Sequence, residues 1–248
     1  MIRVLRSLKH RLDMRRRESR LRLQFDEFTA KARSKGQRFE MEWEARMPCY
    51  GDDTPNTDFD RHYVYHPAWA ARIVREIAPD KHVDISSTLY FCSMLSAFIP
   101  VDFYDYRPAK LELTGLRSKP GDLMALPFAD NSLPSLSCMH TVEHIGLGRY
   151  GDPLDPDGDL KAIAELKRVV KPGGSLLFVT PTGRPRIVYN AHRIYSYDQV
   201  LEAFIGFDLR EFALVPDKDE DGGLIRNATP AMANVQSYGC GCYWFVKR

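Results

Sequence analysis

The chain has 248 residues, of which 44% are hydrophobic and 27% charged, and its formal net charge is +2. This length suffices for one domain with a substantial buried core and an appendage. No apolar run is long enough to cross a bilayer, and the first residues lack the apolar core of a signal peptide. Three of the five cysteines lie in apolar segments, which indicates reduced thiols and a cytoplasmic protein.

The small net charge hides a strong asymmetry along the chain. Residues 1–38 contain thirteen basic and four acidic residues, a net charge of +9, so residues 39–248 carry −7. Apolar residues at helical spacing lie in the basic segment, and these are Ile2, Leu5, Leu8 and Leu12. The pattern predicts a basic amphipathic helix.

Three roles for this helix remain open. It packs on the domain or on a second subunit of a homo-oligomer, or it contacts anionic lipid at the inner face of the membrane through residues 1–38. Nucleic acid is the third option. The negative charge of residues 39–248 argues against a nucleic-acid substrate, because phosphate contacts need a basic groove.

Helical and strand patterns alternate in the rest of the chain. The predicted helices and strands, in chain order, are helix 66–77, strand 82–86, helix 89–98, strand 101–105, strand 133–140, a helix that ends near 165–174, strand 175–180, helix 197–204 and strands 207–215 and 238–247. Strands that alternate with helices predict βαβ units in a doubly wound, mostly parallel, Rossmann-like sheet with a C-terminal antiparallel hairpin. We expect residues 1–46 to form the helical extension, 47–80 a lid or linker with the first helix, and 81–248 the sheet domain.

Three motifs in the second half of the chain occur in a diagnostic order. They are Gly121-Asp-Leu-Met-Ala-Leu-Pro-Phe-Ala-Asp-Asn-Ser132, His140-Thr-Val-Glu-His144 and Glu165-Leu-Lys-Arg-Val-Val-Lys-Pro-Gly-Gly174. This order resembles class I S-adenosylmethionine-dependent methyltransferases over roughly residues 80–248.

A narrower resemblance rests on four other motifs. They are Asp60-Arg-His-Tyr63, His82-Val-Asp-Ile-Ser-Ser87, Phe103-Tyr-Asp-Tyr-Arg-Pro108 and His140-Thr-Val-Glu-His-Ile-Gly-Leu-Gly-Arg-Tyr150. They resemble the DUF268-type methyltransferase-like proteins, which are often associated with bacterial surface-polysaccharide synthesis.

The methyltransferase resemblance places the methionine end of the cofactor after the first strand, where the family has an acid followed by G-x-G-x-G. Here the acid is Asp84, and the glycine positions hold Ser86, Thr88 and Tyr90. Ser86 and Ser87 can offer hydroxyl and N–H groups to a carboxylate. We expect the Tyr90 side chain to crowd the usual cofactor path.

The resemblance also implies residues for the nucleoside of the cofactor. Asp105, followed by Tyr106, matches the acid that accepts both ribose hydroxyls, and Asp122 with Leu123 matches the adenine position. Read alone, each aspartate is also an ordinary turn residue.

His140, Glu143 and His144 follow the fourth predicted strand. Three interpretations remain open. The residues cap the cofactor pocket, with His140 on its edge; they act as a general base; or they hold Mg²⁺ or Mn²⁺.

Substrate contacts are expected from two regions. A lid containing His62, Tyr63 and Tyr65 precedes the first helix, with packing at the domain edge as the alternative. Arg149, His192 and Tyr195 lie where substrate-specificity insertions usually occur. Cys240-x-Cys242 is too closely spaced for an ordinary metal knuckle and is interpreted as two strand residues.

The resemblance implies a transferase that moves a methyl group from S-adenosylmethionine to an oxygen of a small molecule or glycan. Two alternatives stay open: a cofactor-free scaffold protein in a polysaccharide-assembly system, and an enzyme that uses another nucleotide ligand. The altered first loop favours either alternative, whereas Asp105 and Asp122 favour a nucleoside ligand.

Overall fold

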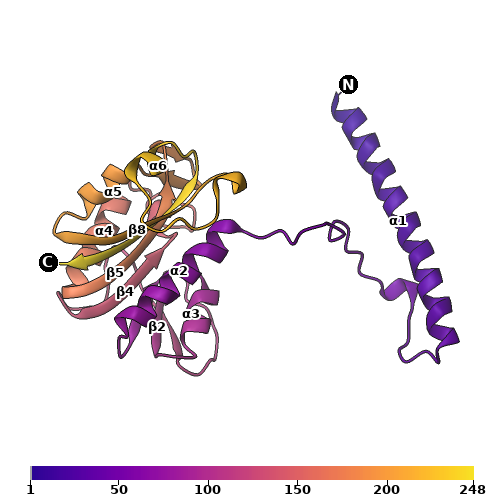
Figure 1. Ribbon diagram of the computed structural model, residues 1–248, viewed down its shortest axis with the longest axis horizontal. Helices are drawn as coiled ribbons and strands as arrows, with labels where there is room; N and C mark the ends of the chain where they lie inside the picture. Colours follow the sequence, from indigo (N-terminus) through magenta and orange to yellow (C-terminus); the bar gives the residue numbers. More distant parts are fainter. Residues whose placement is uncertain (1) are drawn as a thin grey trace. The chain divides into compact units, whose positions relative to one another are not determined.

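A computed structural model describes residues 2–248, without the side chains of residues 2–5 and 7. The chain forms two compact units, residues 1–58 and residues 59–248 (Figure 1). Among the described residues, no helix combines the length and the apolar character needed to cross a membrane.

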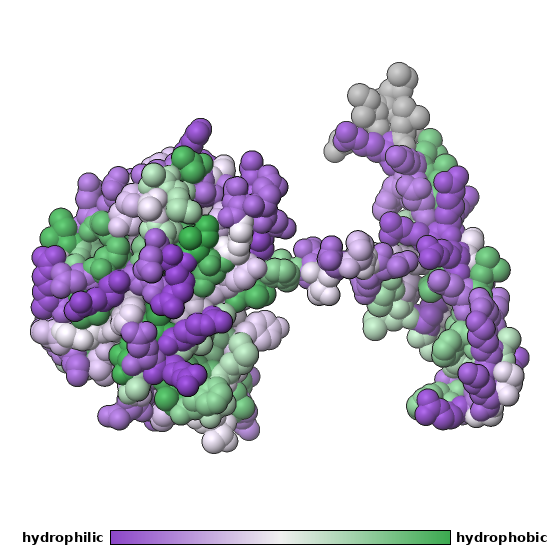
Figure 2. All heavy atoms as spheres, in the orientation of Figure 1, coloured by the Kyte–Doolittle hydropathy of each residue, from purple (hydrophilic) through white to green (hydrophobic). Residues whose placement is uncertain are grey.

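The first unit is built on one long helix, α1 (Ile2–Ser34), followed by a 3-10 turn, η1 (Trp43–Ala45). The segment after η1 folds back on α1, since Arg46 Nη2 and Tyr50 Oη donate to the Glu18 carboxylate at 2.7 and 2.6 Å. The visible face of α1 is mostly hydrophilic in Figure 2.

The predicted helix is confirmed, but its amphipathic character is not. Apolar and charged side chains of α1 are not segregated onto opposite faces. The side chains of Leu8 and Leu12 are 51% and 55% exposed, and those of Ile2 and Leu5 lie outside the described residues. The apolar stripe is too short to give α1 one continuous apolar face.

The second unit contains a seven-stranded sheet in the order β3-β2-β1-β4-β5-β9-β8. The parallel strands are β1 (His82–Ile85), β2 (Val101–Asp105), β3 (Leu116–Pro120), β4 (Leu133–Met139) and β5 (Val170–Thr182). The antiparallel pair is β8 (Phe207–Val215) and β9 (Gly239–Lys247). This topology confirms the predicted Rossmann-like sheet with a C-terminal hairpin.

Helices cover both faces of the sheet (Figure 1). The larger helices are α2 (Arg61–Ile77), α3 (Leu89–Leu95), α4 (Gly158–Val169), α5 (Tyr197–Ala203) and α6 (Pro230–Asn234). Side chains of β5 alternate between the two cores: Leu177 packs in the cluster containing Trp69 of α2, and Phe178 in that containing Leu166 of α4. A separate hairpin, β6 (Arg186–Val188) with β7 (His192–Ile194), and the short turns η2 (Val142–His144) and η3 (Asp219–Asp221) complete the unit.

Helix α2 differs from the prediction in both start and surroundings. It begins at Arg61 rather than His66, because the Asp60 side chain accepts a hydrogen bond from the Tyr63 N–H and caps the helix. Since Trp69 and Ile73 pack in the sheet's core, α2 belongs to the sheet unit, which starts at residue 59 rather than 81.

Candidate functional site

The carboxyl ends of the parallel strands meet at one edge of the sheet, where open α/β sheets bind their ligands. Four segments reach this edge: the loop after β1, Asp105 at the end of β2, Asp122 after β3, and His140 after β4. Because β9 runs antiparallel to β5, its first residues, including Cys240, lie at the same edge. The sheet thus gathers side chains that are up to about 150 residues apart in sequence.

The loop after β1 keeps a glycine-like backbone without glycine. Ser86 has φ +55°, in the left-handed region that glycine adopts without strain. Its carbonyl accepts from Thr141 Oγ1 at 3.0 Å, and its N–H donates to the Tyr104 carbonyl at 2.8 Å. The Tyr90 side chain is 80% exposed, so the expected crowding by Tyr90 is not seen.

Asp84 fixes this loop from inside the protein. Its carboxylate is fully buried and accepts hydrogen bonds from the Ser87 N–H at 3.0 Å and from the Ser137 hydroxyl. Burial raises the pKa of Asp84 to about 6, although the hydrogen bonds from Ser137 and Ser87 oppose that shift. Both oxygens are used within the fold, so Asp84 shapes the loop instead of facing a ligand.

Asp105 and Asp122 lie at the ends of neighbouring strands. The Gly121 N–H donates to the Asp105 carbonyl at 3.0 Å and joins the two turns. One carboxylate oxygen of each aspartate accepts from a backbone N–H two residues on, of Arg107 and of Met124 respectively. Next to them, Tyr106 is 54% exposed and Leu123 is buried.

His140 is the centre of a second group. Its backbone also has a left-handed φ of +55°, and its Nδ1 lies 2.8 Å from Glu143 Oε1. Burial opposes the charged form of His140, but the adjoining Cys240 and Glu143 raise its pKa to about 10. Glu143 is 1% exposed, and no described residue forms a hydrogen bond with its Oε2.

The Nδ1 atom of His144 faces away from the pair formed by His140 and Glu143. Nδ1 donates to the Ala191 carbonyl at 2.6 Å, which Arg149 Nη1 also contacts at 2.9 Å. Its Nε2 lies 3.9 Å from Glu143 Oε1. Burial lowers the pKa of His144, so the ring is neutral near pH 7. Arg149 thus supports the loop carrying Ala191.

The first turns of α2 bring aromatic side chains to His140. The rings of His62 and His66 lie 5.2 and 5.1 Å from the His140 ring, and that of Tyr63 lies 5.5 Å away. Tyr238 stacks on the other side of His62 at 5.0 Å. The His192 ring in turn lies 4.8 Å from that of Tyr238.

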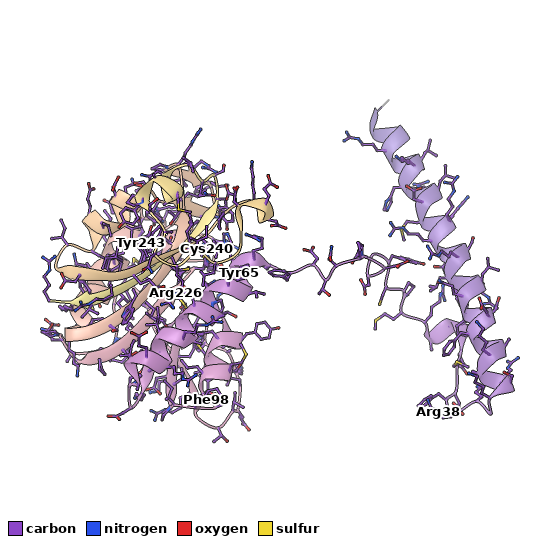
Figure 3. The ribbon with its side chains drawn as sticks, viewed as in Figure 1. Arg38, Tyr65, Phe98, Arg226, Cys240 and Tyr243 are labelled. Carbon is purple, nitrogen blue, oxygen red and sulfur yellow. The ribbon has the colours of Figure 1, made fainter. Side chains whose placement is uncertain are left out.

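Two of the predicted substrate residues lie elsewhere. Tyr65 lines a cavity of about 500 Å³ beside Trp69 and Arg226, and Figure 3 labels Tyr65 and Arg226. Tyr195 lines another cavity, of about 450 Å³, and its hydroxyl donates to Asp159 Oδ2 at 2.9 Å. The structure therefore joins His62, Tyr63 and His192 to the His140 group, and it separates Tyr65 and Tyr195 from it.

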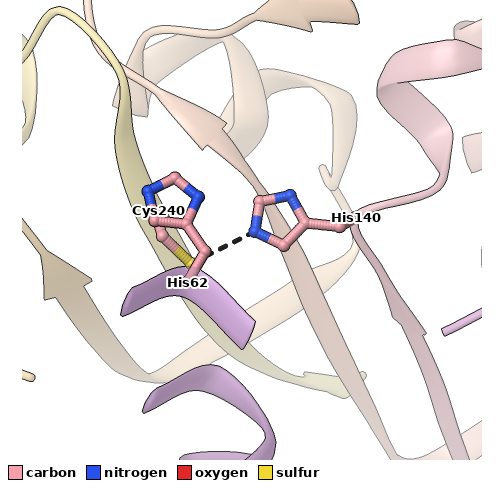
Figure 4. A group of neighbouring side chains, drawn as sticks. All are labelled: His62, His140 and Cys240. Carbon is pink, nitrogen blue, oxygen red and sulfur yellow. Dashed lines mark hydrogen bonds between the residues drawn. The ribbon is translucent and has the colours of Figure 1, made fainter. Parts of the chain in front are cut away.

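The sequence interpretation missed Cys240 and Tyr238. Cys240 Sγ lies 3.4 Å from His140 Nε2 and 3.8 Å from Cys242 Sγ. One possible ligand atom from each of His62, His140 and Cys240 lies within 4.8 Å of the others (Figure 4). The Cys240-x-Cys242 motif could have indicated a metal site, but the histidines that meet Cys240 lie about 100 and 180 residues earlier in the chain.

The metal set considered from the sequence, His140 with Glu143 and His144, is not the one assembled. Glu143 Oε1 is bonded to His140 Nδ1, and His144 Nδ1 is bonded to the Ala191 carbonyl. Among the described residues, metal-ligand spacing occurs instead at His62, His140 and Cys240. Two nitrogens and one sulfur suit neither Mg²⁺ nor Mn²⁺, which prefer oxygen ligands.

Comparison with known proteins supports both resemblances. Residues 130–220 match the family model described as "Caenorhabditis protein of unknown function, DUF268". Among curated protein sequences, none is similar enough to count as a relative.

Solved structures extend the comparison to the fold. The YcgJ protein of Bacillus subtilis superposes with a TM-score of 0.51 at 14% identity, over 74% of this chain and 99% of that one. Geranyl diphosphate methyltransferase, solved in complex with SAM, gives a TM-score of 0.52 at 12% identity, over 73% of this chain and 85% of that one. At such low identities the similarity is one of fold. Residues 130–220 thus match the DUF268 family model, and the sheet unit has the class I methyltransferase fold.

Proposed function

We propose that the protein is an S-adenosylmethionine-dependent methyltransferase that acts on a hydroxyl group of a small molecule or glycan. The observation that carries the proposal is the left-handed backbone at Ser86, held beside Asp105 and Asp122 at the ligand-binding edge of the sheet. A chain with no ligand at this edge has no physical reason to maintain a strained serine after β1, next to the partly exposed carboxylates that follow β2 and β3.

The residues at this edge fit the cofactor. Asp105 would receive its ribose hydroxyls and Asp122 with Leu123 its adenine. Its methionine end would lie against the Ser86 and Ser87 loop, whose N–H groups already donate to the Tyr104 carbonyl and the Asp84 carboxylate. The bound cofactor supplies an electrophilic methyl group on a sulfonium centre. Exposure of the Tyr90 side chain supports this assignment, since the ring is turned out to solvent.

The acceptor side would be formed by the aromatic group around His140. Tyr63 and Tyr238 are 48% and 40% exposed, so their rings can stack on a sugar or a similar flat apolar face. A neutral hydroxyl is a weak nucleophile and must lose its proton during transfer. His144 suits this task, because the Ala191 carbonyl fixes its Nδ1 proton and leaves the Nε2 lone pair free.

Binding of the cofactor can be tested by calorimetry on the full chain with S-adenosylmethionine and S-adenosylhomocysteine. We expect micromolar dissociation constants for the wild type, at least tenfold weaker binding for Asp105→Asn and Asp122→Asn, and wild-type binding for Asp80→Asn. Asp80 is an exposed aspartate that precedes β1 at the opposite edge of the sheet. If the folded wild type binds neither compound, the methyltransferase proposal is wrong and the scaffold or another nucleotide ligand takes its place.

A further inference from the structure

We propose that the protein binds one Zn²⁺ ion through His62, His140 and Cys240, with the fourth coordination position open to water or to an oxygen or sulfur ligand. The three side chains come from separate parts of the fold: the first turn of α2, the end of β4 and the start of β9. This inference concerns metal content and does not depend on methyl transfer.

The distances fit a zinc site. A tetrahedral Zn²⁺ ion with Zn–N bonds of about 2.0–2.1 Å and Zn–S bonds of about 2.3 Å places its ligand atoms about 3.3–3.6 Å apart. His140 Nε2 and Cys240 Sγ are 3.4 Å apart, and the His62 nitrogen lies within 4.8 Å of both. To complete the site, only the partly exposed His62 side chain at the start of α2 has to move closer to His140 Nε2 and Cys240 Sγ.

The His140 ring is already oriented as a ligand. Its Nδ1 lies 2.8 Å from Glu143 Oε1 and its Nε2 lies 3.4 Å from Cys240 Sγ, so a Zn²⁺ ion that displaces the Nε2 proton would bind between Nε2 and Sγ. A carboxylate behind the imidazole is the usual support of a zinc-bound histidine, because it fixes the tautomer and makes the ring a stronger donor. Glu143 therefore acts on the metal through His140, as a positioning residue.

The buried carboxylate of Glu143 also favours a cation at this place. Glu143 is buried, and no described residue forms a hydrogen bond with its Oε2. A buried carboxylate needs positive charge nearby. A divalent ion bound to His140 would supply this charge in place of the displaced His140 proton and would hold the buried Cys240 as a thiolate. The left-handed backbone at His140 is a further sign of a functional position, since such strain concentrates at active sites and ligand clamps.

The donor set selects among metals. One thiolate and two imidazoles are ligands that zinc favours, and three protein ligands with an open position are typical of zinc sites that bind a further ligand. Cys242 Sγ lies 3.8 Å from Cys240 Sγ and provides a neighbouring cysteine for comparison.

Metal content measured by plasma mass spectrometry tests the proposal. Full-length protein would be incubated with Zn²⁺ and desalted to remove weakly bound ion, and we expect about one zinc per chain. His62→Gln and Cys240→Ser should retain less than a tenth of it, while His192→Gln and Cys242→Ser should retain it all. Folding of each variant is checked by circular dichroism. His62 lies at a partly exposed helix start, so His62→Gln tests the site even if Cys240→Ser fails to fold.

Substitution with Co²⁺ gives a second readout. We expect a thiolate-to-cobalt charge-transfer band and the intense visible bands of a four-coordinate ion, both absent from Cys240→Ser. Wild-type protein that retains no zinc, or that retains copper in place of zinc, would overturn the proposal. Equal zinc in the wild type and in both His62→Gln and Cys240→Ser would overturn it too. Calorimetry with S-adenosylmethionine is a separate measurement, so this site and the methyltransferase activity can fail independently.

Discussion

The N–H of Ser86 donates a hydrogen bond to the carbonyl of Tyr104 at 2.8 Å, and this bond ties the loop after β1 to the end of β2. The Ser86 hydroxyl also lies 3.2 Å from the same carbonyl. The two segments assigned to the methionine end and the ribose of the cofactor are thus held at a fixed spacing, although the family's glycines are missing.

The backbone conformation of Ser86 predicts how substitutions there affect stability. Ser86→Val places a β-branched side chain at φ +55° and should lower the free energy of unfolding by about 1–2 kcal/mol. Ser86→Gly should change it by less than about 1 kcal/mol, because relief of strain offsets the greater freedom of the unfolded chain. Urea denaturation of the full chain measures both. Equal destabilisation by the two variants would contradict the left-handed conformation.

Buried His82 predicts a loss of stability in acid. Its two ring nitrogens lie 2.7 and 2.8 Å from the hydroxyls of Ser135 and Ser137, and burial lowers its pKa to about 3. Below the usual histidine pKa of about 6.5, His82 binds a proton in the unfolded chain but stays neutral in the folded chain. The contribution of neutral His82 to the free energy of unfolding is therefore complete above pH 6.5 and decreases as the pH falls from 6.5 to 3.

His82→Gln removes that titration and should flatten the stability curve. Between pH 7 and pH 5, the wild type should lose about 1–2 kcal/mol more of its unfolding free energy than the variant does. Asp84, whose pKa burial raises to about 6, opposes this trend below pH 6, so the comparison is made between the two proteins at each pH. Parallel curves for wild type and His82→Gln would show that His82 is not buried as a neutral ring.

An ion pair between the buried Glu211 and the half-exposed Arg226 supports the contact of α2, which carries His62, with β8. Glu211 Oε1 accepts from Trp69 Nε1 at 3.0 Å, and the Arg226 guanidinium pairs with the same carboxylate. Arg226→Met leaves Glu211, which is 6% exposed, without its counter-charge and should cost about 1–3 kcal/mol of unfolding free energy.

The matched control is Arg210→Met, at an exposed position of β8, the strand that carries Glu211. It should lower the free energy of unfolding by less than about 0.5 kcal/mol. Chemical denaturation distinguishes the two. The double variant Arg226→Met with Glu211→Gln should regain part of the loss, since it no longer buries an unpaired charge. No recovery in the double variant would indicate that Arg226 acts by packing.

The role assigned to His144 predicts a kinetic effect. His144→Gln should lower kcat about 10²- to 10⁴-fold on a hydroxyl acceptor methylated by the wild type, because the general base is lost. S-adenosylhomocysteine production measures the rate. Affinity for S-adenosylmethionine should change less than threefold, and His10→Gln, at an exposed position of α1, should leave both quantities unchanged. An undiminished kcat would remove His144 from the mechanism.

Local sequence patterns predicted the strands whose side chains are buried on both faces. Strands β1, β2 and β4 agree with prediction to within one residue at either end, because short apolar runs mark them. Strand β3 was missed, since of Leu116-Arg-Ser-Lys-Pro120 only Leu116 is buried. The helix predicted to extend toward Gly174 ends at Val169, where Val170 pairs with Leu133, because Pro172 and the glycines after it cannot continue a helix.

The sequence predicted only those parts of the site that lie within a local motif or directly after a recognisable strand. Asp105 follows a strand that was predicted, whereas Asp122 follows the missed strand β3, so its position was expected only from the methyltransferase resemblance. The meeting of His140 with Cys240 depends on β9 running antiparallel beside β5, a pairing over long sequence distance that no local pattern encodes. The place of His62 depends in turn on the Asp60 cap that starts α2 early.

Diffraction from crystals of the full chain grown with S-adenosylhomocysteine would test the central claim most directly. We expect electron density for the ribose with its two hydroxyls on the Asp105 carboxylate, the adenine beside Asp122 and Leu123, and the homocysteine carboxylate at the Ser86 and Ser87 loop. Density for the compound at another place, or its absence from crystals of folded protein at saturating concentration, would contradict the claim.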